Sequence, residues 1–150
     1  MAFRKGQAAL DFLMTYGWAI ALVVIIAAVL FSMGLFDTSN FVGNKATGFS
    51  GVSVKDWSYT AGGAFSVLFS NQVGQPVNIN NVTVTVGGTP YDVTGSNAVV
   101  QVGANSGAFT ATGLANGTAG TGYTATLVVG YSTPSGFNYT SAGTLTGKMV

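Results

Sequence analysis

Side chains able to do chemistry are scarce in this chain of 150 residues. It has no Cys and no His, and its four carboxylates are all Asp: Asp11, Asp37, Asp56 and Asp92. General acid–base catalysis needs a positioned pair tuned near neutral pH, and a Ser-His-Asp triad needs a His. A thiolate metal site needs Cys, and an oxygen-rich metal site gathers several carboxylates. The sequence therefore predicts a protein that is not an enzyme and holds no metal and no cofactor.

The position of one carboxylate, Asp11, indicates a possible function. It lies at the edge of residues 12–36, a run of 25 residues (36 − 12 + 1) without a charged side chain. A charge in hydrocarbon costs on the order of 2.5–3.5 kcal/mol, so an acid beside such a run is by default a functional residue that needs a partner. The residues before Asp11 indicate that partner.

The sequence Arg4-Lys5-Gly6-Gln7 precedes Asp11. A cut after Gly6 would give Gln7 a free α-amino group four residues before Asp11, roughly 6 Å along an α-helix. That amine titrates near ~8 and is largely cationic at neutral pH. We expect it to pair with the Asp11 carboxylate of a neighbouring copy of the same helix, which would fix the axial offset of the two copies.

This N-terminal segment resembles the class III signal peptide of archaeal type IV pilins and archaellins. The resemblance covers roughly the first 36 residues and rests on the basic residues, the Gly, the acid at the fifth position after the cut and the long apolar helix. It implies that a prepilin peptidase recognises Arg4, Lys5 and Gly6 and cleaves between Gly6 and Gln7. It also implies an assembly ATPase and a polytopic platform protein as partners. Bacterial pilins usually carry Glu where this chain has Asp11, and Phe where it has Gln7.

The resemblance divides the N-terminal part into a leader of residues 1–6 and an apolar helix of residues 7–36. Residues 22–31 are consecutive apolar side chains, so this helix has no polar face and must be buried in lipid or among copies of itself. The residues that we expect in a filament core are Phe12, Leu22, Val24, Ile25, Leu30 and Phe31. Gly17 is either a packing contact or a place where the helix can loosen. Arg4 and Lys5 place the start of the chain in the cytoplasm by the positive-inside rule.

Simpler interpretations remain open for the same residues. Arg4 and Lys5 are also typical of an ordinary secretory signal, although an apolar run of 25 residues (12–36) exceeds the ~7–15 of its hydrophobic region. Asp11 alone would also complement the positive end of a helix dipole, an effect of ~0.3–1 kcal/mol.

After the cut, three Lys would stand against four Asp, a balance of −1. A nearly neutral chain offers no electrostatic footprint for nucleic acid.

Short polar residues at 37–40 predict a hinge, because they compete with helix hydrogen bonds. The remaining residues, 41–150, alternate as strands with one buried side. The expected inward sets are Phe65, Val67 and Phe69; Val82, Val84 and Val86; Tyr123, Ala125, Leu127, Val129 and Tyr131; and Phe137 and Tyr139. Val77 and Ile79 are in the opposite phase to Val82, which predicts a bulge or bend at Asn80-Asn81.

Turn signals recur between these strands, and residues 113–122 read as a mobile Gly-rich loop. The fold class is therefore α+β: a long N-terminal hydrophobic helix and then an antiparallel immunoglobulin-like β-sandwich head. Lys55-Asp56 is expected at a solvated strand end. Trp57 and Tyr59 are expected to pack in the head rather than to form a sugar-stacking platform.

Three sequons, Asn81-Val82-Thr83, Asn116-Gly117-Thr118 and Asn138-Tyr139-Thr140, are candidate N-glycosylation sites. If Val82 faces inward, Asn81 faces outward, and the same argument from Phe137 and Tyr139 turns Asn138 outward. Asn116 lies in the Gly-rich loop. Each is expected at the surface, as a glycan requires, and the resemblance to archaeal pilins also implies a glycosylated head.

The sequence thus predicts a structural filament subunit, a precursor in the cytoplasmic membrane that polymerises with itself into an extracellular pilus-like filament after cleavage. Surface adhesion is the expected purpose. One alternative is an archaellin of a swimming filament. Another is a surface binding module on a permanent single-span anchor that never polymerises.

Overall fold

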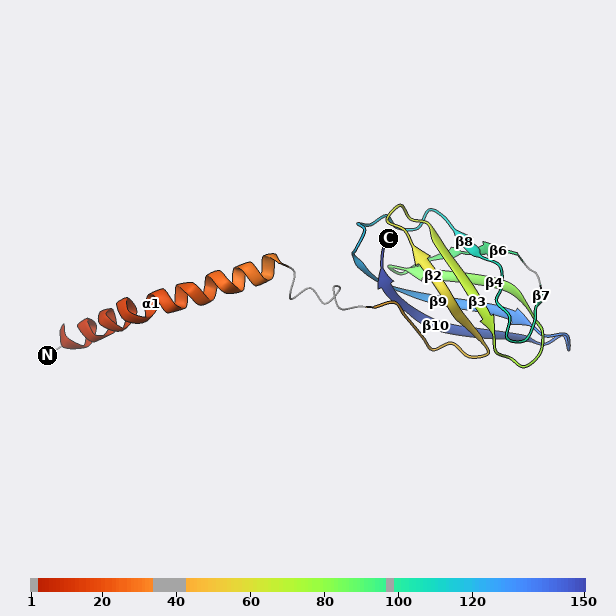
Figure 1. Ribbon diagram of the computed structural model, residues 1–150, viewed down its shortest axis with the longest axis horizontal. Helices are drawn as coiled ribbons and strands as arrows, with labels where there is room; N and C mark the ends of the chain where they lie inside the picture. Colours follow the sequence, from red (N-terminus) through yellow and green to blue (C-terminus); the bar gives the residue numbers. More distant parts are fainter. Residues whose placement is uncertain (1–2, 34–42, 97–98) are drawn as a thin grey trace. The chain divides into compact units, whose positions relative to one another are not determined.

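The computed structural model describes residues 3–33, 43–96 and 99–150. The chain divides into two units, Met1–Asn40 and Phe41–Val150, and each is considered by itself (Figure 1). The architecture is α+β, an apolar helix followed by an antiparallel β-sheet domain. The hinge expected at residues 37–40 lies outside the described residues.

The first unit contains one α-helix, α1, which covers Phe3–Ser32 and is 30 residues long. Its start precedes Gln7, so residues 3–6 of the expected leader share helical backbone with the segment that follows them. Leu, Ala and Met supply intrinsic helix propensity, and the run contains no Pro to break the hydrogen-bond ladder. Residues 34–36, the expected end of this helix, lie outside the described residues.

The second unit is built from β-strands. They are β1 (Lys45–Thr47), β2 (Val52–Tyr59), β3 (Phe65–Asn71), β4 (Val77–Val86), β5 (Thr89–Asp92), β6 (Thr94–Gly95), β7 (Val99–Val100), β8 (Phe109–Ala111), β9 (Gly122–Ser132) and β10 (Asn138–Lys148). One sheet has the order β1-β10-β9-β4-β5, with β7 also paired to β4, and the other has the order β2-β3-β8-β6. The pairings among the described strands are antiparallel.

A single apolar core lies between the two sheets, which overlie one another in Figure 1. Leu127 and Val129 of β9 project into it from the larger sheet, and Phe65, Val67 and Phe69 of β3 project from the smaller one. The inward sets predicted for β3 and β9 are confirmed. In β4, Val82 and Val84 are buried as expected, whereas Val86 is half-buried.

The predicted change of phase in β4 is also confirmed. Val77 and Ile79 are buried before it, Val82 and Val84 after it, and the pairing with β9 shifts register between Ile79 and Asn81. The extra residue of this bulge is Asn80. The bulge allows one strand to keep both apolar sets in the core.

The prediction that Phe137 and Tyr139 are buried in the core is wrong. Their side chains are 64% and 46% exposed. Tyr139 is the register partner of Tyr131 and stacks on its ring, with centroids 5.6 Å apart. It therefore shares the inward side of the sheet but lies near the end of β10, where no opposing layer covers it.

Two smaller predictions also need correction. Lys55 and Asp56 are solvated as expected, but they lie inside β2 at a register shift rather than at its end. The Gly-rich loop at residues 113–122 is held in place by its contacts. Leu114 is buried in the core, and its N–H donates to the carbonyl of Gly63 at 3.0 Å. The N–H of Gly117 donates to the carbonyl of Ala61 at 3.0 Å.

Candidate assembly helix and surface asparagines

The apolar part of α1 is long enough to cross a membrane. It runs over Ala8–Ser32, 25 residues with a mean hydropathy of 2.4, and none of it is buried within the described structure. At 1.5 Å per residue it measures about 38 Å, against a hydrocarbon core of about 30 Å. Asp11 is its sole charged residue. By length and composition this helix fits a membrane anchor, a signal sequence or a helix that is covered by other helices.

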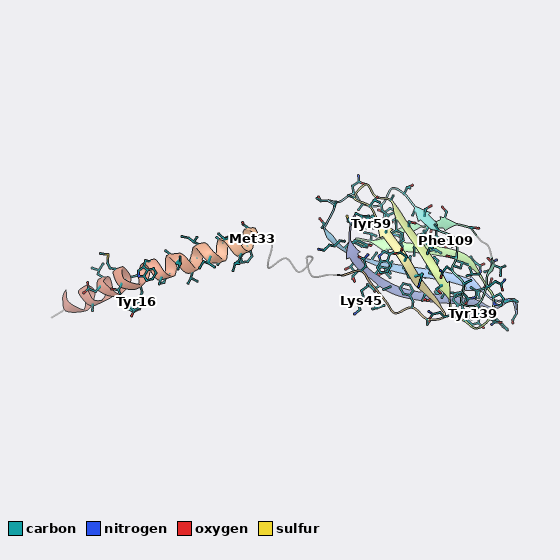
Figure 2. The ribbon with its side chains drawn as sticks, in the orientation of Figure 1. Tyr16, Met33, Lys45, Tyr59, Phe109 and Tyr139 are labelled. Carbon is teal, nitrogen blue, oxygen red and sulfur yellow. The ribbon has the colours of Figure 1, made fainter. Side chains whose placement is uncertain are left out.

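The side chains expected in a filament core surround the helix on all sides. Phe12, Leu22, Val24, Ile25 and Phe31 are exposed, and Leu30 is half-buried by its neighbours in the helix. Figure 2 shows side chains projecting in several directions along α1, from the labelled Tyr16 to its end before the labelled Met33. Continuous apolar surface of this extent does not persist in water and requires a cover.

Asp11 lies on the first turns of α1, and its side chain is exposed. Its backbone carbonyl accepts a hydrogen bond from the Thr15 hydroxyl at 2.8 Å. Gln7 and Asp11 are four residues apart in one continuous helix, a spacing that places both on the same face. The side chains of Arg4, Lys5 and Gln7 lie outside the described residues. Among the described residues no ion pair is formed with the Asp11 carboxylate.

Part of the α1 surface is hollowed, a feature that the sequence analysis missed. Tyr16, Ala19, Ile20, Val23 and Val24 line a shallow apolar depression of about 280 Å³. Tyr16 packs against Phe12, with ring centroids 4.7 Å apart, and forms one wall. The small side chain of Ala19 between larger neighbours is the sequence signal for such a depression, and small residues let helices approach closely.

All three sequon asparagines are exposed. Asn81 follows the β4 bulge and faces away from the buried Val82, as argued from the sequence. Its register partner on β9 is Gly130, which has no side chain. Asn138 is the register partner of Ser132 and so lies on the other face of β10 from Tyr139, as argued from the sequence, although the aromatic residues on either side of it are exposed too.

The aromatic residues Trp57 and Tyr59 pack in the head, as predicted. The indole Nε1 of Trp57 donates to the hydroxyl of Tyr123 at 2.8 Å, and the Tyr59 ring meets the Tyr123 ring edge-on at 4.9 Å. The hydroxyl of Tyr59 donates to the carbonyl of Ala115. Burial raises the pKa of Tyr123, an effect that the Trp57 hydrogen bond opposes, and burial also raises the pKa of Tyr59. This cluster stabilises the head.

A buried polar residue that the sequence analysis overlooked is Asn71, at the end of β3. Its Nδ2 donates to the carbonyls of Gln75 and Val100 and its Oδ1 accepts from the N–H of Val73, each at 2.9 Å. The Asn71 side chain thus connects the β3–β4 loop to β7 by hydrogen bonds. Asn71 is in phase with Phe65, Val67 and Phe69, and a polar residue in phase with an apolar face is the signal that could have found it.

No protein-family model and no curated protein matches the chain. A solved structure with some likeness to it is the X-ray structure of Northeast Structural Genomics Consortium target SoR45, at 10% identity and a TM-score of 0.37. That likeness covers 70% of this chain and 83% of the other. It supports no conclusion about fold family or function.

Proposed function

We propose that this chain is the structural subunit of an archaeal type IV pilus-like filament. The precursor sits in the cytoplasmic membrane, a prepilin peptidase cleaves it between Gly6 and Gln7, and an assembly ATPase and a platform protein drive its polymerisation. The mature chains form an extracellular filament on the cell surface that serves adhesion. The observation that carries the proposal is α1: Ala8–Ser32 is apolar on every side and has a single charge, at Asp11.

The exposed apolar surface of α1 supports polymerisation. Full burial of a Val, Leu, Ile or Phe side chain is worth about 1.5–3 kcal/mol relative to water. A helix can leave lipid for an aqueous fibre only if neighbouring helices bury it almost completely. The apolar depression at Tyr16, Ala19 and Val23 gives a neighbouring helix a place to approach closely.

The position of Asp11 supports a role in register. In a core without water, a carboxylate without a partner is expensive, whereas one paired with the Gln7 amine of the next subunit is attracted by about 4 kcal/mol at ~4 Å and an effective dielectric of ~20. An axial offset between neighbouring helices that brings these two groups together is therefore favoured over other axial offsets.

We assign the head an immunoglobulin-like topology, supported by two antiparallel sheets around one core. We also propose that Asn81, Asn116 and Asn138 carry glycans, supported by their exposure. Sugar on a nearly uncharged head would keep the filament surface soluble.

The decisive experiment replaces Asp11 in cells that make the filament. Asp11→Ala is expected to insert and to be cleaved normally, but to slow or abolish polymerisation, while Asp11→Glu keeps the charge with a longer reach and should partly assemble. Thr15→Ala is the matched control on the same face, because it removes a hydroxyl bonded only to the Asp11 backbone. Electron microscopy of sheared fibres and the mass of the mature N-terminus are measured together. Cleaved Asp11→Ala protein that polymerises at the normal rate would refute the pairing.

A further inference from the structure

A cavity of about 310 Å³ opens at one end of the larger sheet. Its walls come from β4, from β7 and from the turn that follows β9. The lining residues are Pro76, Val77, Asn78, Val99, Ser132, Thr133 and Pro134. None of these described lining residues is charged. By volume the cavity corresponds to roughly ten water molecules at ~30 Å³ each, and it is at the lower end of the ~300–1,000 Å³ typical of ligand sites.

Two side chains in the cavity wall carry buried oxygen atoms without a hydrogen-bond partner. These atoms are Oδ1 of Asn78 and Oγ1 of Thr133, and the Thr133 side chain is 5% exposed. Leaving a buried polar group unsatisfied is unfavourable, and such groups are rare in folded proteins. Both atoms lie beneath the wall, so each side chain must turn about a side-chain bond to reach the cavity. Neither oxygen loses a hydrogen bond when it turns.

Pairing across the sheet places further polar groups beside the cavity. Asn78 is the register partner of Ser132, and Ser132 is the partner of Asn138. Residues directly opposite in an antiparallel pair share a face, so a carboxamide, a hydroxyl and a second carboxamide stand in one row. The Ser132 hydroxyl also lies 3.4 Å from Oδ1 of Asn80. The row offers neutral donors and acceptors.

The cavity lies far from the point where the chain enters the head. Lys45 of β1 pairs with Thr146 of β10, whereas the turn between β9 and β10 lies beyond Asn138. Eight residues separate Thr146 from Asn138, about 26 Å along a strand. Figure 2 shows the labelled Lys45 and Tyr139 well apart along the head. Two exposed aromatic residues, Phe137 and Tyr139, belong to the same hairpin as the cavity wall.

We infer that this cavity binds one unit of a neutral saccharide. A pyranose carries several hydroxyl groups that both donate and accept hydrogen bonds, as the Asn78 carboxamide and the hydroxyls of Ser132 and Thr133 require. Its C–H faces suit the apolar sides of Val99 and Pro134. An anionic ligand finds no cation among the lining residues, and a metal ion finds no carboxylate there.

This inference rests on the adhesive role proposed above for its biological meaning, since an accessible sugar site at the end of the head would be the receptor site of an adhesive filament. The binding itself is a property of the head and is measured on the unpolymerised chain. A negative result therefore removes the sugar site and leaves polymerisation untouched, whereas the Asp11 variants test polymerisation and leave the sugar site untouched.

The test is saturation-transfer difference NMR on the full chain, held in micelles of a detergent without a sugar head group. The protein is made in a host that does not glycosylate sequons, so that the Asn138 side chain is bare. The probes are glucose, galactose, mannose and N-acetylglucosamine, with the anionic N-acetylneuraminic acid as the charged comparison. Thr133→Val removes the unpartnered hydroxyl at nearly constant shape, and Asn78→Leu removes the carboxamide. Thr83→Val, at a position of β4 that does not line the cavity, is the matched control.

At least one neutral sugar is expected to receive saturation from the wild type. Thr133→Val and Asn78→Leu should each weaken that binding by about tenfold, the usual effect of one lost hydrogen bond, while Thr83→Val leaves it unchanged. The melting temperature of Thr133→Val should stay the same or rise. Val99→Phe enlarges an exposed side chain of the cavity lining without changing either polar group and should also abolish binding, which keeps the test valid if another variant fails to fold.

The absence of a saturation-transfer signal from all four neutral sugars would overturn the inference and leave ordered water as the content of the cavity. Unchanged binding in Thr133→Val, Asn78→Leu and Val99→Phe would also overturn it, because the sugar would then bind elsewhere. Saturation of N-acetylneuraminic acid equal to that of the neutral sugars would contradict the selectivity that the uncharged wall requires.

Discussion

Val24 lies deep in the apolar part of α1, 16 residues after Ala8 and 8 residues before Ser32. These separations correspond to about 24 Å and about 12 Å along the helix. An Asp at this position cannot reach water from either end of a ~30 Å hydrocarbon layer. Insertion of the precursor would cost about 2.5–3.5 kcal/mol more, which the many apolar neighbours can offset. We therefore expect Val24→Asp to enter the membrane and to be cleaved.

The same carboxylate is far more damaging in a fibre. Each subunit would bury it among side chains that offer no partner, at a penalty of several kcal/mol per ion. A penalty of only about 3 kcal/mol already raises the concentration needed for assembly by roughly 150-fold. Val24→Thr is the matched control, since it has nearly the same shape and no charge, and we expect it to assemble with a modest loss.

The assay for Val24→Asp and Val24→Thr has two parts. Carbonate extraction of membranes measures insertion, and the yield of sheared fibres measures assembly. Val24→Asp should appear in the membrane fraction at normal mass and should give no fibre, whereas Val24→Thr gives both. Fibres of Val24→Asp at the wild-type yield would refute the argument that α1 is buried by other helices. Loss of Val24→Asp from the membrane fraction as well would contradict the calculated ease of insertion.

Three further predictions concern processing and the head. Gly6→Val should leave an uncleaved precursor in the membrane and no filament, and a mature N-terminus at Gln7 in that variant, read by mass spectrometry, would contradict it. Asn71→Leu removes three side-chain hydrogen bonds, two to carbonyls and one from an N–H, so urea unfolding should show a loss of about 3 kcal/mol in the free energy of unfolding; a loss below the scatter of the method would disprove the structural role of Asn71. Burial raises the pKa of Tyr59 and Tyr123 above the ordinary value of 10.0, so the folded state holds these phenol protons more tightly than the unfolded state does. Their contribution to the free energy of unfolding is full below pH 10 and is lost as pH rises through the raised pKa values, which urea unfolding and tyrosinate absorbance at rising pH can check.

Local patterns predicted those parts of the fold that depend on neighbours in sequence. The phase change between Ile79 and Val82 predicted the β4 bulge, because alternation along one strand reports directly which side is buried. The alternation of β9 from Tyr123 to Tyr131 was equally informative. A continuous apolar run likewise predicted α1, whose identity depends on composition alone.

Features that depend on the opposing layer were harder to predict. Phe137 and Tyr139 alternate like a buried pair, but Phe137 lies in the turn before β10 and Tyr139 is the second residue of that strand, and a local sequence pattern does not show where the opposing layer stops. Leu114 is a single large apolar residue in a Gly-rich stretch, and its burial anchors a loop that composition alone would leave mobile. The cavity at Asn78 and Thr133 joins residues far apart in sequence, and only the pairing of β4 with β9 brings them together.

The central claim is that α1, freed of its leader, becomes the buried core of an extracellular fibre. Hydrogen-exchange mass spectrometry of detergent-free fibres sheared from cells tests it directly, because the same peptides report the first residue of the chain. The account predicts a chain that begins at Gln7, with residues 22–31 protected from exchange in the absence of any lipid or detergent. Finding the chain solely as a detergent-soluble monomer that still begins at Met1, in cells that make surface fibres, would contradict it.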